Sequence, residues 1–314
     1  MRTTTLFFAF VLLVIPCTPQ SGYSCINEYR AYLDGNIVFK DVEGVAPRGR
    51  FSQRETQILH NALHRADSTY AATGSIEDYS DYGAMLAYNG KYLQAKEVFV
   101  AIEQQSPGRY TTAANLGTCY ELLGQNDSAF YWITRAVGIN PESHHSSEWI
   151  HGKILEAKLN SKGNPQYFQT HSILGLDFGE GETPQNIHNI DLIAVRANLY
   201  EQLGERMSFV EPKDPIVAQL IFDLGNINAM TIDVKSALQV YEIAEKYGFS
   251  SELLDKRRKH FEALQWQAEF MNTTVGWAKA NPLVAFLLLL VSSVAFILWL
   301  IFVVQKCRSK KAGK

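Results

Sequence analysis

The chain has 314 residues, four of them cysteines, and a formal net charge of −3 at pH 7. All 32 acidic residues lie between residues 21 and 280. Without Arg2 and the five basic residues of the C-terminal tail, 23 basic residues remain, so this region has a net charge near −9. Such an acidic region is a poor candidate for nucleic acid binding, because phosphate contacts are made mainly by Lys and Arg. Two cysteines in that region exclude a disulfide-rich scaffold.

The N-terminus has the pattern of a secretory signal. Arg2 is followed by the apolar run Leu6–Ile15, which Pro16 ends. Ten apolar residues are too few to span a bilayer, which needs about 20. We therefore predict a removed signal peptide over residues 1–21. Lipidation of Cys17 or Cys25 is a less favoured alternative, since the residues before both cysteines fit a lipoprotein signal poorly.

Residues 22–75 are predicted to form an N-terminal loop and a helix. The turn residues Asp34, Gly35 and Asn36 precede a short apolar run, which indicates a short hairpin or loop. Ser52 and Glu55 have the spacing of a capping box that begins a helix reaching about Tyr70.

Residues 76–160 contain an internal repeat with a period of 34 residues. The first copy consists of Tyr79, Tyr82, Gly83, Leu86, Ala95, Phe99, Ile102 and Pro107. The second consists of Ala113, Leu116, Gly117, Tyr120, Ala129, Ile133, Ala136 and Pro141. Each copy has two apolar stripes at helical spacing, separated by a Gly-containing turn, so each is predicted to be a helix-turn-helix unit.

These residues resemble the tetratricopeptide repeat family. The match is close for Leu116, Gly117 and Tyr120, followed by Ala129, Ala136 and Pro141. The first copy departs from the family pattern at Tyr82, Leu86 and Ile102. An ordinary helical hairpin bundle is the alternative, and the family pattern specifies a fold rather than a ligand.

The resemblance implies a concave surface that binds a protein or peptide partner. Its groove-facing positions would be Glu77, Ser80, Ala84, Ala87, Tyr88, Thr111, Ala114, Thr118, Glu121 and Leu122. The set contains no Lys or Arg, which departs from the subfamily that clamps C-terminal carboxylates. It suits an apolar or basic peptide instead. The alternative is that these residues pack against the neighbouring repeat.

One cluster of residues could hold a metal ion. His144, Glu148 and His151 would share one face of a continuous helix, which suggests a membrane-anchored metal-dependent hydrolase as the alternative function. The order differs from that of zinc peptidases, and the segment follows Pro141, so a polar helix start is the simpler interpretation. No nucleophile or phosphate-loop motif occurs in the sequence. We therefore predict a non-enzymatic protein without a cofactor.

Beyond the repeats, residues 161–186 are predicted to be an irregular insertion that could hold one strand. Residues 187–275 are predicted to be helical and repeat-like, since Ala237, Tyr241 and Ala244 recover the spacing of a second repeat helix. The stretch from Ile216 to Leu224 would be its partner, joined by a longer turn. Outside the cytoplasm, Cys25 and Cys119 could pair; a buried, unpaired Cys119 is the favoured alternative.

The C-terminal region has the pattern of a membrane anchor. The 22 residues from Leu283 to Val304 carry no charge, and Trp277 and Trp299 lie near the two ends. The tail, residues 305–314, contains five basic and no acidic residues, which places it in the cytoplasm. A bacterial sorting tail looks similar, although no sorting motif precedes it.

Together these features predict an all-α fold. It is a tetratricopeptide-like helix-turn-helix solenoid with a short non-helical insertion and one C-terminal transmembrane helix. The predicted function is a membrane-tethered scaffold for protein–protein interaction that belongs to an envelope complex. The few cysteines favour the bacterial periplasm.

Overall fold

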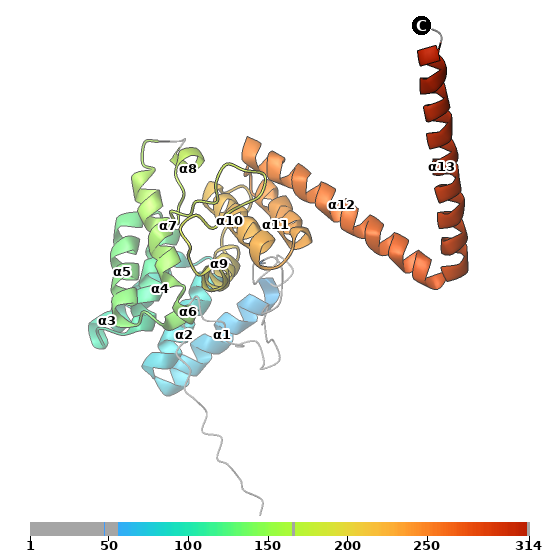
Figure 1. Cartoon of the computed structure of the whole chain (residues 1–314). Helices are drawn as coiled ribbons and strands as arrows, with labels where there is room; N and C mark the ends of the chain where they lie inside the picture. Colours follow the sequence, from blue (N-terminus) through green and yellow to red (C-terminus); the bar gives the residue numbers. More distant parts are fainter. Residues whose placement is uncertain (1–46, 48–55, 165–166, 313–314) are drawn as a thin grey trace, which may run out of the picture. The chain divides into compact units, whose positions relative to one another are not determined.

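The computed structural model describes residues 47, 56–164 and 167–312 (Figure 1). The predicted signal peptide, the turn at residues 34–36, Cys25 and the capping box at Ser52 lie outside these residues. No strand occurs in the described part of the chain, which confirms the all-α prediction. The strand considered for residues 161–186 is therefore wrong for the described part of that segment, which has only a short helix, α8 (Tyr167–Thr170).

The described chain divides into two compact units. The first contains residues 56–170 and 201–210, and the second contains residues 171–200 and 211–312. The helices of the first unit are α1 (Thr56–Thr73), α2 (Ile76–Tyr88), α3 (Tyr92–Gln105), α4 (Tyr110–Leu122), α5 (Asn126–Ile139), α6 (Ser143–Ser146), α7 (Glu148–Asn160) and α8. Helix α9 (Leu192–Arg206) begins in the second unit, and its residues from Glu201 onward belong to the first.

In the first unit, α2 packs against α3, and α4 packs against α5 (Figure 1). Each pair depends on a glycine that allows the helices to approach. A Cβ added at Gly83 would lie 2.8 Å from Cζ of Phe99, and one added at Gly117 would lie 2.5 Å from Cδ1 of Ile133. Ala95 and Ala129, at the other close contacts, are fully buried. The predicted tetratricopeptide-like packing is thus present in both pairs.

The second unit contains a further pair with the same chemistry. Helix α10 (Pro215–Thr231) packs against α11 (Val234–Lys246), and a Cβ added at Gly225 would collide with the ring of Tyr241. Gly225 and Tyr241 are sixteen residues apart, as are Gly83 and Phe99. The expectation of a repeat-like pair is met, but the longer turn is wrong, since two residues separate α10 from α11.

The non-helical segment between α8 and α9 is anchored in the second unit by two polar side chains. Arg257, whose side chain is fully buried, donates to the carbonyl oxygens of Phe178 and Gly181 and to Oδ1 of Asn226. Gln219 accepts from the backbone N–H of Ile173 and donates to the carbonyl of His171. These bonds satisfy backbone groups that an irregular segment would otherwise leave unpaired.

The second unit ends in two long helices, α12 (Glu252–Ala280) and α13 (Pro282–Ala312). Only Leu254, Arg257 and Phe261 of α12 are buried. Helix α13 contains a 21-residue stretch, Pro282–Phe302, that is long and apolar enough to cross a membrane, and none of it is buried. Its exposed side chains therefore match those of a helix that lipid would cover.

Candidate functional site

Most of the predicted groove residues are covered in the first unit. Ser80, Ala84, Ala87, Thr111, Ala114 and Thr118 are buried. Glu77, Tyr88, Glu121 and Leu122 are partly exposed. Glu77 forms an ion pair of 3.2 Å with Arg109 at the start of α4. The concave surface is therefore not open along its length.

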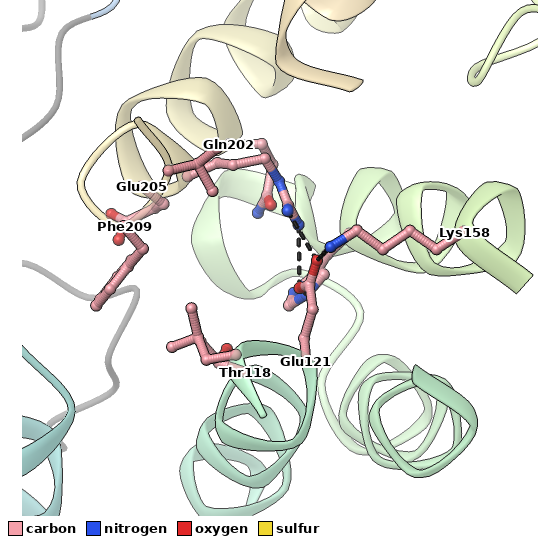
Figure 2. A pocket seen from close by; sticks show the side chains of 10 residues that line it. Thr118, Glu121, Lys158, Gln202, Glu205 and Phe209 are labelled. Atoms are coloured by element: carbon pink, nitrogen blue, oxygen red, sulfur yellow. Dashed lines mark hydrogen bonds and ion pairs between the residues drawn. The ribbon is translucent and has the colours of Figure 1, made fainter. Parts of the chain in front are cut away.

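The chain itself fills much of this surface. The segment Glu201–Val210, which includes the last part of α9, supplies Arg206 and Phe209. The guanidinium of Arg206 donates to both carboxylate oxygens of Glu121, at 2.8 and 3.1 Å (Figure 2). The ring of Phe209 stacks on Tyr88 with a centroid separation of 5.2 Å. Thus one basic and one aromatic residue contact the positions predicted to bind a basic or apolar peptide.

Glu121 is the centre of a buried ionic network. Besides Arg206, it accepts from Nζ of Lys158 at 2.6 Å and from Nε2 of His151 at 2.6 Å. Its side chain is only 7% exposed. Burial alone would raise the pKa of Glu121, but the charges of Arg206 and His151 outweigh burial and hold that pKa well below its ordinary value.

His151 lies between two carboxylates. Its Nδ1 is 3.2 Å from Oε1 of Glu148, and its Nε2 faces Glu121. A carboxylate can only accept a hydrogen bond, so both ring nitrogens carry protons in this arrangement. Burial would lower the pKa of His151, but Glu121 and Glu148 raise it overall. Tyr110 donates to the other oxygen of Glu148 at 3.2 Å, which fixes that carboxylate.

A pocket of about 70 Å³ opens beside this network (Figure 2). It is lined by Thr118, Glu121, Leu122, His151, Lys158, Gln202, Glu205, Arg206, Phe209 and Val210. A water molecule needs about 10–15 Å³ of such volume, so the pocket has room for the tip of one side chain. Three predicted groove residues, Thr118, Glu121 and Leu122, therefore border this pocket.

The three residues of the proposed metal site do not lie on one continuous helix. His144 has a φ of 49°, and the next two residues also have positive φ, so α7 begins only at Glu148. Nε2 of His144 is 3.8 Å from Glu148, and His151 is held by its two carboxylates. No group of three His, Cys, Asp or Glu side chains among the described residues has a geometry that would hold a metal ion. The structure gives the metal hypothesis no support.

Cys119 is fully buried beside the first helix pairs. Burial raises the pKa of its thiol to about 12, so it is an unreactive apolar side chain at neutral pH.

The paired helices, their glycine contacts and their short turns define a tetratricopeptide-like helical-repeat protein, a class that generally mediates protein–protein interaction. No family model and no curated protein matches the sequence. Among solved structures, the chain is similar to a tetratricopeptide repeat protein from Parabacteroides merdae. The identity is 14%, the match covers 67% of this chain and 80% of that one, and the TM-score is 0.33. The fold assignment rests on the packing described above and not on this likeness.

Proposed function

We propose that this protein is a membrane-tethered scaffold that holds a helical-repeat domain outside the cytoplasm and docks a partner protein there. The repeat pairs supply the scaffold, and the exposed apolar stretch of α13 supplies the tether. The signal-like N-terminus and the basic tail support an extracytoplasmic domain, in keeping with a bacterial periplasm.

The pocket beside Glu121 is the docking site that we favour. Leu122, Phe209 and Val210 supply apolar walls, while Glu121 and Glu205 supply carboxylates. A partner would insert one apolar side chain, or a basic one whose aliphatic stem contacts those walls. The pocket carries the proposal, because it borders Glu121 and Leu122 while Arg206 and Phe209 of the chain's own segment Glu201–Val210 already contact Glu121 and Tyr88.

Site-specific photo-crosslinking in membranes tests the docking site. A benzophenone amino acid at Leu122 should capture a discrete partner, and adding Val210→Trp should abolish the adduct by filling the pocket. The matched control places the same probe at Leu93, an exposed residue of the outer helix α3. An adduct at Leu122 that survives Val210→Trp, or the same adduct at Leu93, would refute docking in the pocket. Capture of no partner at Leu122 would refute it as well.

The tether is tested separately with Cys307, the natural thiol of the basic tail. In a chain with Cys17→Ser and Cys25→Ser, whose Cys119 is buried, a membrane-impermeant maleimide should label Cys307 only after the cells are permeabilised, and carbonate should not extract the chain. Labelling of Cys307 in intact cells would show that the orientation is wrong, whatever the result at the pocket.

A further inference from the structure

Most of α12 is exposed to solvent. Its first ten residues contain the buried side chains Leu254, Arg257 and Phe261, and α12 packs against α11. From Glu262 to Ala280 no side chain is buried. Large apolar residues are exposed in this stretch, including Leu264 at 38%, Met271 at 58% and Val275 at 43%. A single helix of this length in water gains little from such residues, so their pattern calls for an explanation.

The core-facing stripe of α12 continues without a break along the exposed part. Its residues are Leu254, Arg257, Phe261, Leu264, Ala268, Met271, Val275 and Ala278. The spacing alternates strictly between three and four residues, which is the heptad pattern of a coiled coil. The stripe thus begins in the core of the second unit and keeps its register to the last turn before α13. This stripe, called the seam below, packs against the core of the second unit at its N-terminal end. From Leu264 onward no described residue of the chain covers it.

We propose that a second copy of this chain covers the exposed seam, so that residues 264–278 form a parallel two-stranded coiled coil above the membrane. Ala268 and Val275 occupy the first apolar position of their heptads, and Leu264, Met271 and Ala278 the second. Of these, Val275 at a first position and Leu264 at a second are the residue types that favour two strands. The inference rests on the proposed function in one respect, since the membrane tether sets both copies parallel and concentrates them in a plane.

The residues that flank the seam are compatible with an identical partner. Gln265 and Asn272 lie on one side of it, and Gln267 and Thr274 on the other. All four are uncharged, so two parallel copies would bring no like charges together between Leu264 and Val275. The carboxylates of Glu262 and Glu269 fall on the outer part of the helix, where water can solvate them.

The opposite side of α12 carries aromatic residues. Trp266 and Phe270 stack with a centroid separation of 5.6 Å, and Trp277 follows two turns later. Thr273 interrupts this stripe, and it does not continue into the buried face of the second unit. Tryptophan is typical of the membrane interface. The aromatic stripe is therefore the competing contact surface, with lipid as its occupant, and the experiment must distinguish the two faces.

Disulfide scanning of the full-length chain in carbonate-washed membranes makes this distinction. Cys17, Cys25 and Cys307 are replaced by serine, and the buried Cys119 is retained. Single cysteines at Ala268, Met271 and Val275 should form disulfide-linked dimers under mild oxidation. Matched cysteines at Glu269 and Thr273 should not, because helix axes 8–10 Å apart leave outward-facing Cα atoms beyond the roughly 7 Å limit of a disulfide.

A second measurement keeps the proposal testable if a cysteine disturbs packing. Sedimentation equilibrium in detergent should give a dimer for the parent chain. Met271→Asp should weaken the dimer by at least about tenfold, because it buries an unpaired carboxylate in the seam; Thr273→Asp should leave the dimer unchanged. Equal cross-linking at all positions, cross-links at Glu269 and Thr273 but not at Ala268, Met271 and Val275, or a monomer in the membrane would each overturn the proposal. Release of the chain by carbonate would instead show that the tether has failed.

Discussion

Replacing Glu121 by Gln should loosen the segment Glu201–Val210 more than any other isosteric change of a carboxylate in the first unit. The carboxylate of Glu121 is the shared acceptor for Arg206, Lys158 and His151, and both its side chain and that of Arg206 are at most 10% exposed. Removing one partner from a buried ion pair costs about 3–5 kcal/mol, because a charge is left without compensation. Gln retains one acceptor oxygen, so we expect the low end, about 3 kcal/mol.

Hydrogen exchange of the full-length chain in detergent micelles localises this effect. A loss of about 3 kcal/mol lowers the protection of peptides covering residues 116–123 and 201–210 by roughly 100-fold, since exchange reports the free energy of local opening. Peptides from α10 and α11 should keep their protection.

The control is Glu156→Gln on α7. Glu156 pairs with Lys153 at 2.7 Å, but both side chains are 47% exposed. Such surface pairs contribute about 0–1 kcal/mol, so protection should change by less than about fivefold. If Glu121→Gln has no larger effect than Glu156→Gln, the buried network does not hold the segment and the interpretation is wrong. Adding Arg206→Met to Glu121→Gln should cost little more, because the guanidinium has already lost its partner.

Three further predictions concern other parts of the molecule. The pKa of His151 is raised in the folded chain, so the stability that protonated His151 contributes is complete below its ordinary pKa of 6.5 and is lost as pH rises through the folded pKa. The pKa of Glu121 is lowered, so the stability that its carboxylate contributes is complete above its ordinary pKa of 4.5 and is lost only in stronger acid. Protection of residues 201–210 from hydrogen exchange should thus be highest between about pH 4.5 and 6.5 and should fall at alkaline pH. His151→Gln should remove this fall; if the variant loses protection at alkaline pH as the parent does, the reasoning is wrong. Gly117→Ala should lower the free energy of unfolding in urea by about 1–3 kcal/mol, because the added methyl group would lie 2.5 Å from Ile133. Gly138→Ala on α5, whose added methyl group would meet no atom within 4 Å, should raise it by about 0.5–1 kcal/mol. Equal effects of the two changes would refute the close-approach argument. Burial raises the pKa of Asp223 to about 8, against the influence of Arg257, so its ionisation in the unfolded chain removes stability as pH rises from 3.8 towards 8. Asp223→Asn should make α10 more protected at pH 8 than the parent, and a less protected α10 would show that the carboxylate is needed there.

The helix pairs could be predicted from the sequence because their signals are local. Gly117, Ala129 and Ala136 follow one another within one repeat, and the same pattern 34 residues earlier makes the period visible. Gly225, Ala237 and Ala244 have the same spacing, yet Gly225 was missed. It lies 108 residues after Gly117, which is not a multiple of 34, because the irregular segment shifts the period. A comparison of spacings within each pair, rather than a search at fixed period, would have found it.

The metal hypothesis has no support in the structure for a similarly local reason. It required residues 144–151 to form one helix, but the backbone has positive φ from His144 to Ser146. Such conformations are uncommon for residues other than glycine and are set by the surrounding structure rather than by the residues themselves. A spacing argument is valid only for a continuous helix, and the proximity of Pro141 was the one signal against continuity.

Whether the groove is open or occupied could not be predicted from the sequence, because its occupation depends on contacts between distant parts of the chain. The sequence suggested an apolar or basic peptide for the groove residues, which include Tyr88 and Glu121; that prediction concerns an external partner and stays a prediction. The sequence did not indicate that Arg206, 85 residues after Glu121, would provide a basic contact. No local period relates the two positions, since α7 and the irregular segment lie between them. The chemistry of a concave surface can thus be deduced from one repeat, whereas its occupant can come from the same chain. An intramolecular occupant is held at high effective concentration, so a free peptide must displace Arg206 and Phe209 together. This is why an external partner is expected at the small pocket beside Glu121.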